Sequence, residues 1–147
     1  MDYNEAISRM EGYWDQILSG VSTPHSVEFN PDLSVQGAMS RSGCKAGESI
    51  STGPPWSYHQ AAFFEFDPEL ESTLNSRLEQ MANEGWTVKR RLDVEAANPK
   101  WILVRDDFAI NFTSPSAMER EQSLSSGKSP YNMKLTVISP CAEGGPE

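Results

Sequence analysis

The side chains of this chain that could do chemistry are few, and its two cysteines come first. Cys44 lies in "SRSGCKAGES" and Cys141 in "VISPCAE". Neither has a neighbouring histidine of the kind that activates a thiolate nucleophile. Both also lie outside the apolar patterns, whereas a structural free thiol is usually buried. We therefore expect a Cys44–Cys141 disulfide, with two reduced thiols in a cytosolic protein as the alternative.

A Cys44–Cys141 bond would close a loop of about a hundred residues. The chain-entropy model gives such a loop roughly 4 to 5 kcal/mol of stabilisation as an upper guide. Disulfides persist in oxidising compartments, so this bond would place the chain outside the cytoplasm. The two cysteines therefore decide the expected compartment.

The two histidines are the side chains that could act as a base near neutral pH. His25 lies in the loop-like "TPHSV" and His59 in the strand-like "WSYHQA". A zinc site needs three or four Cys or His ligands at short spacings, which this chain lacks. Walker and GxSxG motifs are also absent. We expect no catalytic, cofactor-binding or metal-ligating residues, and a hydrolase that uses His59 with an aspartate is the weakest activity considered.

An aromatic segment offers one possible ligand surface. Trp56, Tyr58 and His59 follow one another closely after "TGPP". They could lie near the mouth of a pocket between a helix and the sheet. We expect binding rather than catalysis from these three side chains.

Composition limits the fold and the partners. A chain of 147 residues with 37% hydrophobic residues fits one domain with a thin core. The formal net charge of −9 would repel a phosphate backbone, so nucleic acid is excluded as a partner. The longest apolar run is short, "AAFF", and it cannot span a bilayer.

Four segments divide the expected domain, 1–147. Residues 1–20 carry apolar side chains at helical spacing and predict an N-terminal helix. Residues 21–55 are rich in loop-forming types, with one or two short strands and a rigid turn at Pro54-Pro55. Residues 56–141 form a core of strand, helix and strands, and 142–147 form a flexible tail.

The best local signal lies in the core segment. Asp67 is a good N-cap, Pro68 suits the first helical position, and Gly85 suits the residue that ends the helix. Alternation in "WTVKRRLDV" predicts a strand, and "RDD" predicts the turn of a hairpin. Polar residues 114–130 predict an excursion or a lid. This order predicts an α+β fold, with an antiparallel sheet of about four to six strands and two helices on one face.

Several motifs follow one another along the chain: "SGC", "PPW", a capped helix that ends "ANEGW", a strand containing Asp93, a hairpin with "RDDFAINF" and a last strand that ends "LTVISPC". Their order and spacing resemble the LppA-like lipoproteins of actinobacterial cell envelopes. The resemblance covers about Gly43 to Cys141 and an upstream helix. The "SAMEREQSLSSGK" insertion departs from the family pattern.

The resemblance implies a secreted ectodomain with a leader and a lipid-anchor cysteine outside this sequence. Membrane association would then come from the lipid anchor alone. We expect a non-enzymatic binding or adaptor module of the cell envelope, whose partner is a protein, a lipid or a cell-wall component. The alternative is a small acidic cytosolic immunity or inhibitor protein that neutralises a basic protein.

Overall fold

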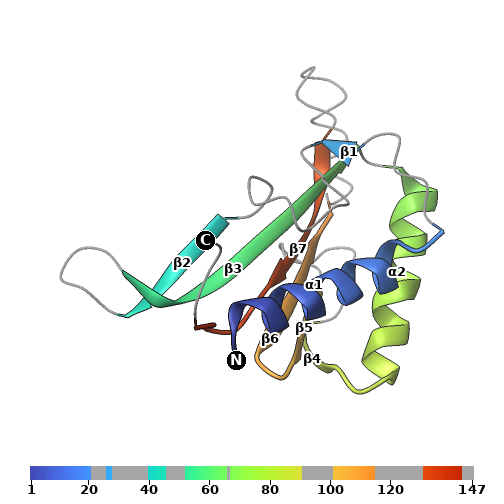
Figure 1. Cartoon of the computed structure of the whole chain (residues 1–147). Helices are drawn as coiled ribbons and strands as arrows, with labels where there is room; N and C mark the ends of the chain where they lie inside the picture. Colours follow the sequence, from blue (N-terminus) through green and yellow to red (C-terminus); the bar gives the residue numbers. More distant parts are fainter. Residues whose placement is uncertain are drawn as a thin grey trace.

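The computed structural model describes residues 1–20, 26–27, 40–45, 52–65, 67–90, 101–114 and 131–143. These residues form two helices and seven strands in one α+β arrangement (Figure 1). The elements in chain order are α1 (Tyr3–Leu18), β1 (Ser26–Val27), β2 (Ser40–Lys45), β3 (Thr52–Glu65), α2 (Pro68–Asn83), β4 (Thr87–Arg90), β5 (Trp101–Arg105), β6 (Phe108–Thr113) and β7 (Tyr131–Ile138).

Helix α1 begins at a capped N-terminus and buries one stripe. The Asp2 side chain accepts a hydrogen bond from the backbone N–H of Glu5 at 2.8 Å, which satisfies one of the free donors of the first turn. Six buried side chains recur at helical spacing on the side that faces the sheet: Tyr3, Ala6, Ile7, Met10, Trp14 and Ile17.

Helix α2 forms where the sequence predicts it. The Asp67 carboxylate accepts from the backbone N–H of Leu70, and Pro68 occupies the first helical turn. Gly85 follows the helix with a φ of +110°, a backbone conformation that residues other than glycine rarely adopt. The helix buries Leu74, Leu78 and Met81 against the sheet.

All described strand pairs are antiparallel. The main path of the sheet runs β1-β3-β7-β6-β5-β4, and β2 pairs with β3 beside it. Helix α2 therefore connects β3 to the far edge strand β4, and the chain then returns toward β3. The α+β class, the antiparallel sheet and the two helices on one face confirm the prediction. Two short strands, β1 and β2, share one edge of β3, which explains why the described sheet reaches seven strands.

The Pro54-Pro55 pair lies inside β3 rather than in the turn that we predicted. Trp56 pairs with Gly43, while Thr52 pairs with Lys45, so the register shifts between these pairs. The two prolines therefore fall in the irregular stretch opposite Cys44. A proline has no backbone N–H to donate, and a bulge is one of the few places in a sheet that tolerates this.

The β5–β6 hairpin turns at Asp106 and Asp107, as "RDD" predicts. Both residues have positive φ, 51° and 65°. Such left-handed pairs suit two-residue hairpin turns because their twist matches that of the strands. Aspartate tolerates this region better than most side chains.

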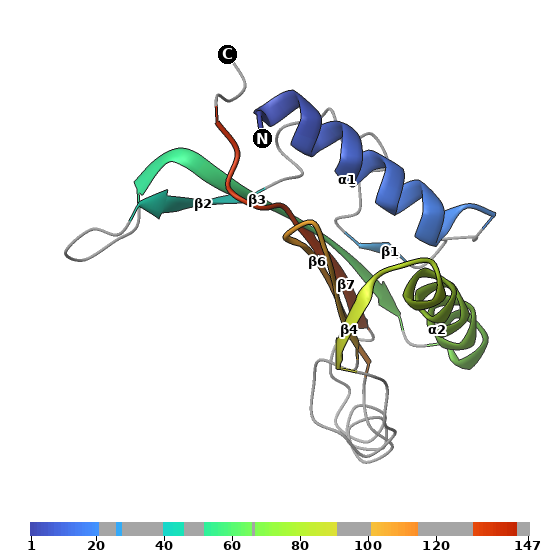
Figure 2. The same cartoon turned by 90° about the horizontal axis from the view of Figure 1, so that it is seen from below.

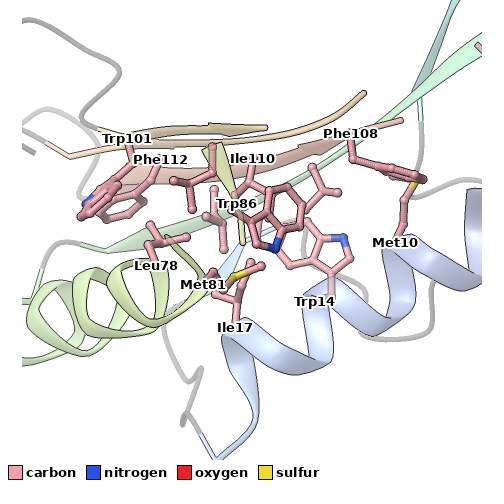
Figure 3. Close-up of a cluster of buried hydrophobic side chains, with 14 of the residues drawn as sticks. Met10, Trp14, Ile17, Leu78, Met81, Trp86, Trp101, Phe108, Ile110 and Phe112 are labelled. Atoms are coloured by element: carbon pink, nitrogen blue, oxygen red, sulfur yellow. The ribbon is translucent and has the colours of Figure 1, made fainter. Parts of the chain in front are cut away.

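The core lies between the sheet and the two helices. Figure 2 shows α1 and α2 on the same side of the sheet. Side chains from both helices meet the inner face of the strands in Figure 3, with Trp14 and Ile17 of α1 and Met81 of α2 close to Trp86. Alternate residues of β5, β6 and β7 fill this layer: Trp101, Leu103, Phe108, Ile110, Phe112, Met133, Leu135 and Val137.

Candidate functional site

The Cys44–Cys141 disulfide is present, as the sequence predicts. It joins β2, at the residue opposite the irregular stretch of β3, to the segment after β7, with the two Cα atoms 6.2 Å apart. Apart from these two, the chain has no cysteine. The bond therefore clamps residues 97 positions apart in the sequence.

The backbone beside the disulfide is also paired. Ala142 exchanges two hydrogen bonds with Trp56, at 2.8 and 3.0 Å. Glu143 accepts from the N–H of Tyr3 and donates to Met1 O, so the start of the chain joins the same ladder. Ala142 and Glu143, which we expected in the flexible tail, are thus held against β3 and Asp2, and 144–147 lie outside the described residues.

Ser139 connects this ladder to β3 through side-chain hydrogen bonds. Its hydroxyl accepts from the N–H of Tyr58 at 2.8 Å, and its carbonyl accepts from the Ser57 hydroxyl at 2.6 Å. Ser139 is almost fully buried. These bonds and the disulfide fix the end of β7 on the first half of β3.

The three residues of the predicted ligand surface do not share one face. Tyr58 is 2% exposed and belongs to the core, and half-buried Trp56 packs against that core. His59 is on the opposite face because successive strand residues point to opposite sides. The structure therefore brings Trp56 and Tyr58 together beneath the helix layer and separates His59 from them.

His59 is a half-buried side chain with a weak polar contact. Its Nε2 lies 3.5 Å from the Ser57 hydroxyl oxygen, at the limit of a hydrogen bond. Burial lowers the pKa of His59 below its usual value. The Ser57 hydroxyl already donates to the carbonyl of Ser139, so its proton is not directed at the imidazole.

Groups for hydrolytic or metal chemistry do not gather in the part of the chain that the structure describes. None of the carboxylates described there bonds to His59. Within the same residues, no group of three or more His, Cys, Asp or Glu side chains could hold a metal ion. His25 and Asp93 lie outside the described residues, as does the 115–130 part of the predicted lid.

The outer face of the sheet carries two cross-strand rows that follow from the register. The first row runs from Val104 through Ala109 and Ile138 to His59. The second row contains four further half-buried side chains, Ile102, Asn111, Thr136 and Ala61. Neither described helix covers this face (Figure 2).

Charge is distributed unequally between the two layers. Helices α1 and α2 together carry six acidic and two basic residues. The outer face of the sheet has no carboxylate among its described side chains, and its exposed positions include Thr87, Lys89 and Lys134. The acidic side chains of the described part therefore lie mainly in the helix layer. The pattern of apolar and polar residues in the sequence could not show this, because it does not reveal on which face of the sheet the helices pack.

Comparison with known proteins gave no match among family models, curated proteins or solved structures. Among the described residues, no helix has the length and apolar character needed to cross a membrane.

Proposed function

We propose that this chain is the ectodomain of an extracytoplasmic lipoprotein of the cell envelope, and that it acts there as a non-enzymatic binding or adaptor module. The observation that carries the proposal is the Cys44–Cys141 disulfide. Such bonds persist in oxidising compartments and are rare in the cytosol of mesophiles. The order of motifs that resembles the LppA-like lipoproteins supports the same compartment.

The outer face of the sheet is the binding surface in this proposal. Its central positions Val104, Ala109 and Ile138 are apolar and half-buried, and the helices pack on the opposite face of these strands. A face of this kind resembles the centre of a protein interface, which is depleted in charge and apolar at its core. The partner is a protein, a lipid or a cell-wall component.

The first experiment tests the compartment. The gene is expressed from its own upstream sequence in its native host, and cell fractions are alkylated under denaturing conditions without a reductant. We expect the chain in the membrane fraction with no alkylated cysteine. Two alkylated cysteines per chain, in a chain recovered from the cytosolic fraction, would contradict the proposal.

The second experiment tests the surface. A photo-crosslinking amino acid replaces exposed Thr87 on the outer face of the sheet, and a matched variant carries it at exposed Ser72 on α2. We expect adducts with an envelope component in intact cells from position 87 and none from position 72. Irradiation that yields no adduct at position 87 would rule out this surface.

A second candidate function is supported by the acidic helices. An immunity or inhibitor protein would use such a surface to neutralise a basic partner, because opposite charges speed association and fix the register. Adducts from position 72 alone, together with reduced cysteines in cells, would favour this candidate over the first.

A further inference from the structure

Three neutral polar side chains are buried where the start of α1 meets β3. Tyr3 is 8% exposed, and Tyr58 and Gln60 are each 2% exposed. The hydroxyl oxygens of both tyrosines and both amide atoms of Gln60 are buried without a hydrogen-bond partner among the described residues. Most buried polar groups in native proteins have a partner, so four such atoms in one region need an explanation.

The three side chains come from two facing elements, α1 and β3. The rings of Tyr3 and Tyr58 meet edge to face, with centroids 5.0 Å apart. Gln60 is the next residue on the same face of β3, because it follows Tyr58 by two positions. Its cross-strand partner is the apolar Val137, which offers no side-chain hydrogen bond.

The chemistry of these groups favours a neutral bound molecule, which we call the guest. Each hydroxyl and the amide can both donate and accept a hydrogen bond. Apart from tyrosines and tryptophans, the buried polar side chains of the described part are Gln60, Ser114 and Ser139, so no buried charge is described that could compensate an ionic guest. A hydroxyl-bearing molecule matches the donors and acceptors without bringing a charge into the core.

We propose that Tyr3, Tyr58 and Gln60 form an internal binding site for a neutral hydroxyl-bearing guest, which is ordered water or a small polyol that replaces it. Buried water commonly makes about three hydrogen bonds to groups of this kind. The site lies beside the disulfide-clamped ladder, whose backbone hydrogen bonds join Trp56 of β3 and Tyr3 of α1 to the segment after β7.

The test uses Gln60→Leu, Tyr58→Phe and the double variant in the intact, oxidised chain. If a guest bridges the groups, each single change lowers Tm by about 3 °C, and the double change lowers it by less than the sum. If the atoms are simply unpaired, each change removes a desolvated group and raises Tm, and the two effects add. That second result would overturn the proposal.

A direct readout keeps the test valid if one variant folds poorly. Oxygen-17 relaxation dispersion detects internal water that exchanges slowly. We expect Tyr58→Phe to lose one or more such waters relative to the wild type, while Tyr13→Phe serves as control because the Tyr13 hydroxyl has a protein partner, Arg9. The proposed site would be contradicted by an oxygen-17 signal that is unchanged in a folded Tyr58→Phe variant, together with a glycerol effect on Tm that is the same in the wild type and in Gln60→Leu.

Glycerol distinguishes the two sources of the hydroxyl group. It is compared with betaine, an osmolyte without hydroxyl groups, at equal osmolality. A greater rise in Tm with glycerol in the wild type than in Gln60→Leu identifies a polyol guest. Equal responses, together with the oxygen-17 signal, identify water.

Discussion

Arg9 Nη2 lies 2.8 Å from Asp106 Oδ2, and this ion pair joins the middle of α1 to the turn between β5 and β6. The guanidinium also donates to the Tyr13 hydroxyl at 2.6 Å and lies over the Phe108 ring, 4.6 Å from its centroid. The hydrogen bond to Asp106 is the main reason that the pKa of Arg9 is raised, and burial opposes it. One side chain therefore couples helix, turn and core.

We predict a small, salt-sensitive loss of stability in Asp106→Asn. The carboxylate is exposed, so the pair contributes about 0.2 to 1 kcal/mol, and asparagine tolerates the left-handed backbone. Urea unfolding at low salt and at 1 M NaCl measures the effect, which should shrink as salt screens the charges. A loss that is equal at both salt concentrations would assign the effect to the turn instead.

We predict that Asp107→Gly raises the free energy of unfolding by up to about 1 kcal/mol. Asp107 has a φ of 65° and no described ion pair, so glycine relieves the backbone without breaking a contact that the structure describes. Asp107→Ala is the matched control and should be less stable than the glycine variant. Urea midpoints in the order glycine, aspartate, alanine would agree with this explanation.

Much of this fold could be predicted from the sequence, because the helix start and the hairpin turn are each determined by a few neighbouring residues. Asp67 and Pro68 begin α2 through contacts inside one turn, and "RDD" folds back on itself without help from the rest of the chain. The disulfide was also predictable, because both cysteines lie outside every apolar pattern. These features depend on sequence neighbours or on residue type alone.

Other features depend on partners far away in the sequence. The sequence of Pro54-Pro55 predicts a turn, and only the pairing of β3 with β2 shows that the two prolines lie in an irregular stretch of a strand. The sequence suggests that Gln60 is an ordinary polar strand residue, but it lies on the inner face of β3 and is 2% exposed. Trp56, Tyr58 and His59 looked like one surface because they are adjacent in sequence, but strand alternation places His59 on the other face.

We predict that reduction of the Cys44–Cys141 bond strongly destabilises the chain. The bond closes a loop with a sequence separation of 97, for which the chain-entropy model gives roughly 4 to 5 kcal/mol as an upper guide, while measured values are typically 2 to 4. Urea unfolding with and without a phosphine reductant measures the difference. The Cys44→Ser/Cys141→Ser double variant should match the reduced protein and should not respond to the reductant.

We predict that His59 makes stability fall as the pH falls below about 6.5, its ordinary pKa. Burial lowers its pKa in the folded state, so the unfolded chain binds the proton first, and stability is lost until the folded pKa is also passed. His59→Gln should flatten the pH dependence between pH 7.5 and 5 relative to the wild type. Parallel stability curves for the two proteins would show that His59 does not contribute.

A pair of glycine substitutions tests how closely Gly53 is packed. A Cβ at Gly53 would lie 2.5 Å from Trp56 Cδ2 and 2.6 Å from the Pro55 carbonyl oxygen, so something must move. We predict that Gly53→Ala lowers the free energy of unfolding by about 1 to 3 kcal/mol.

The matched change, Gly12→Ala, adds the same methyl group to an exposed position inside α1, where it would meet nothing within 4 Å. It should raise the free energy of unfolding by something near 1 kcal/mol, because alanine favours the helix over glycine. Opposite signs for the two variants in urea unfolding would assign the cost of Gly53→Ala to the close contacts with Trp56 and the Pro55 carbonyl oxygen. A stabilised Gly53→Ala variant would mean that β3 adjusts freely around its prolines.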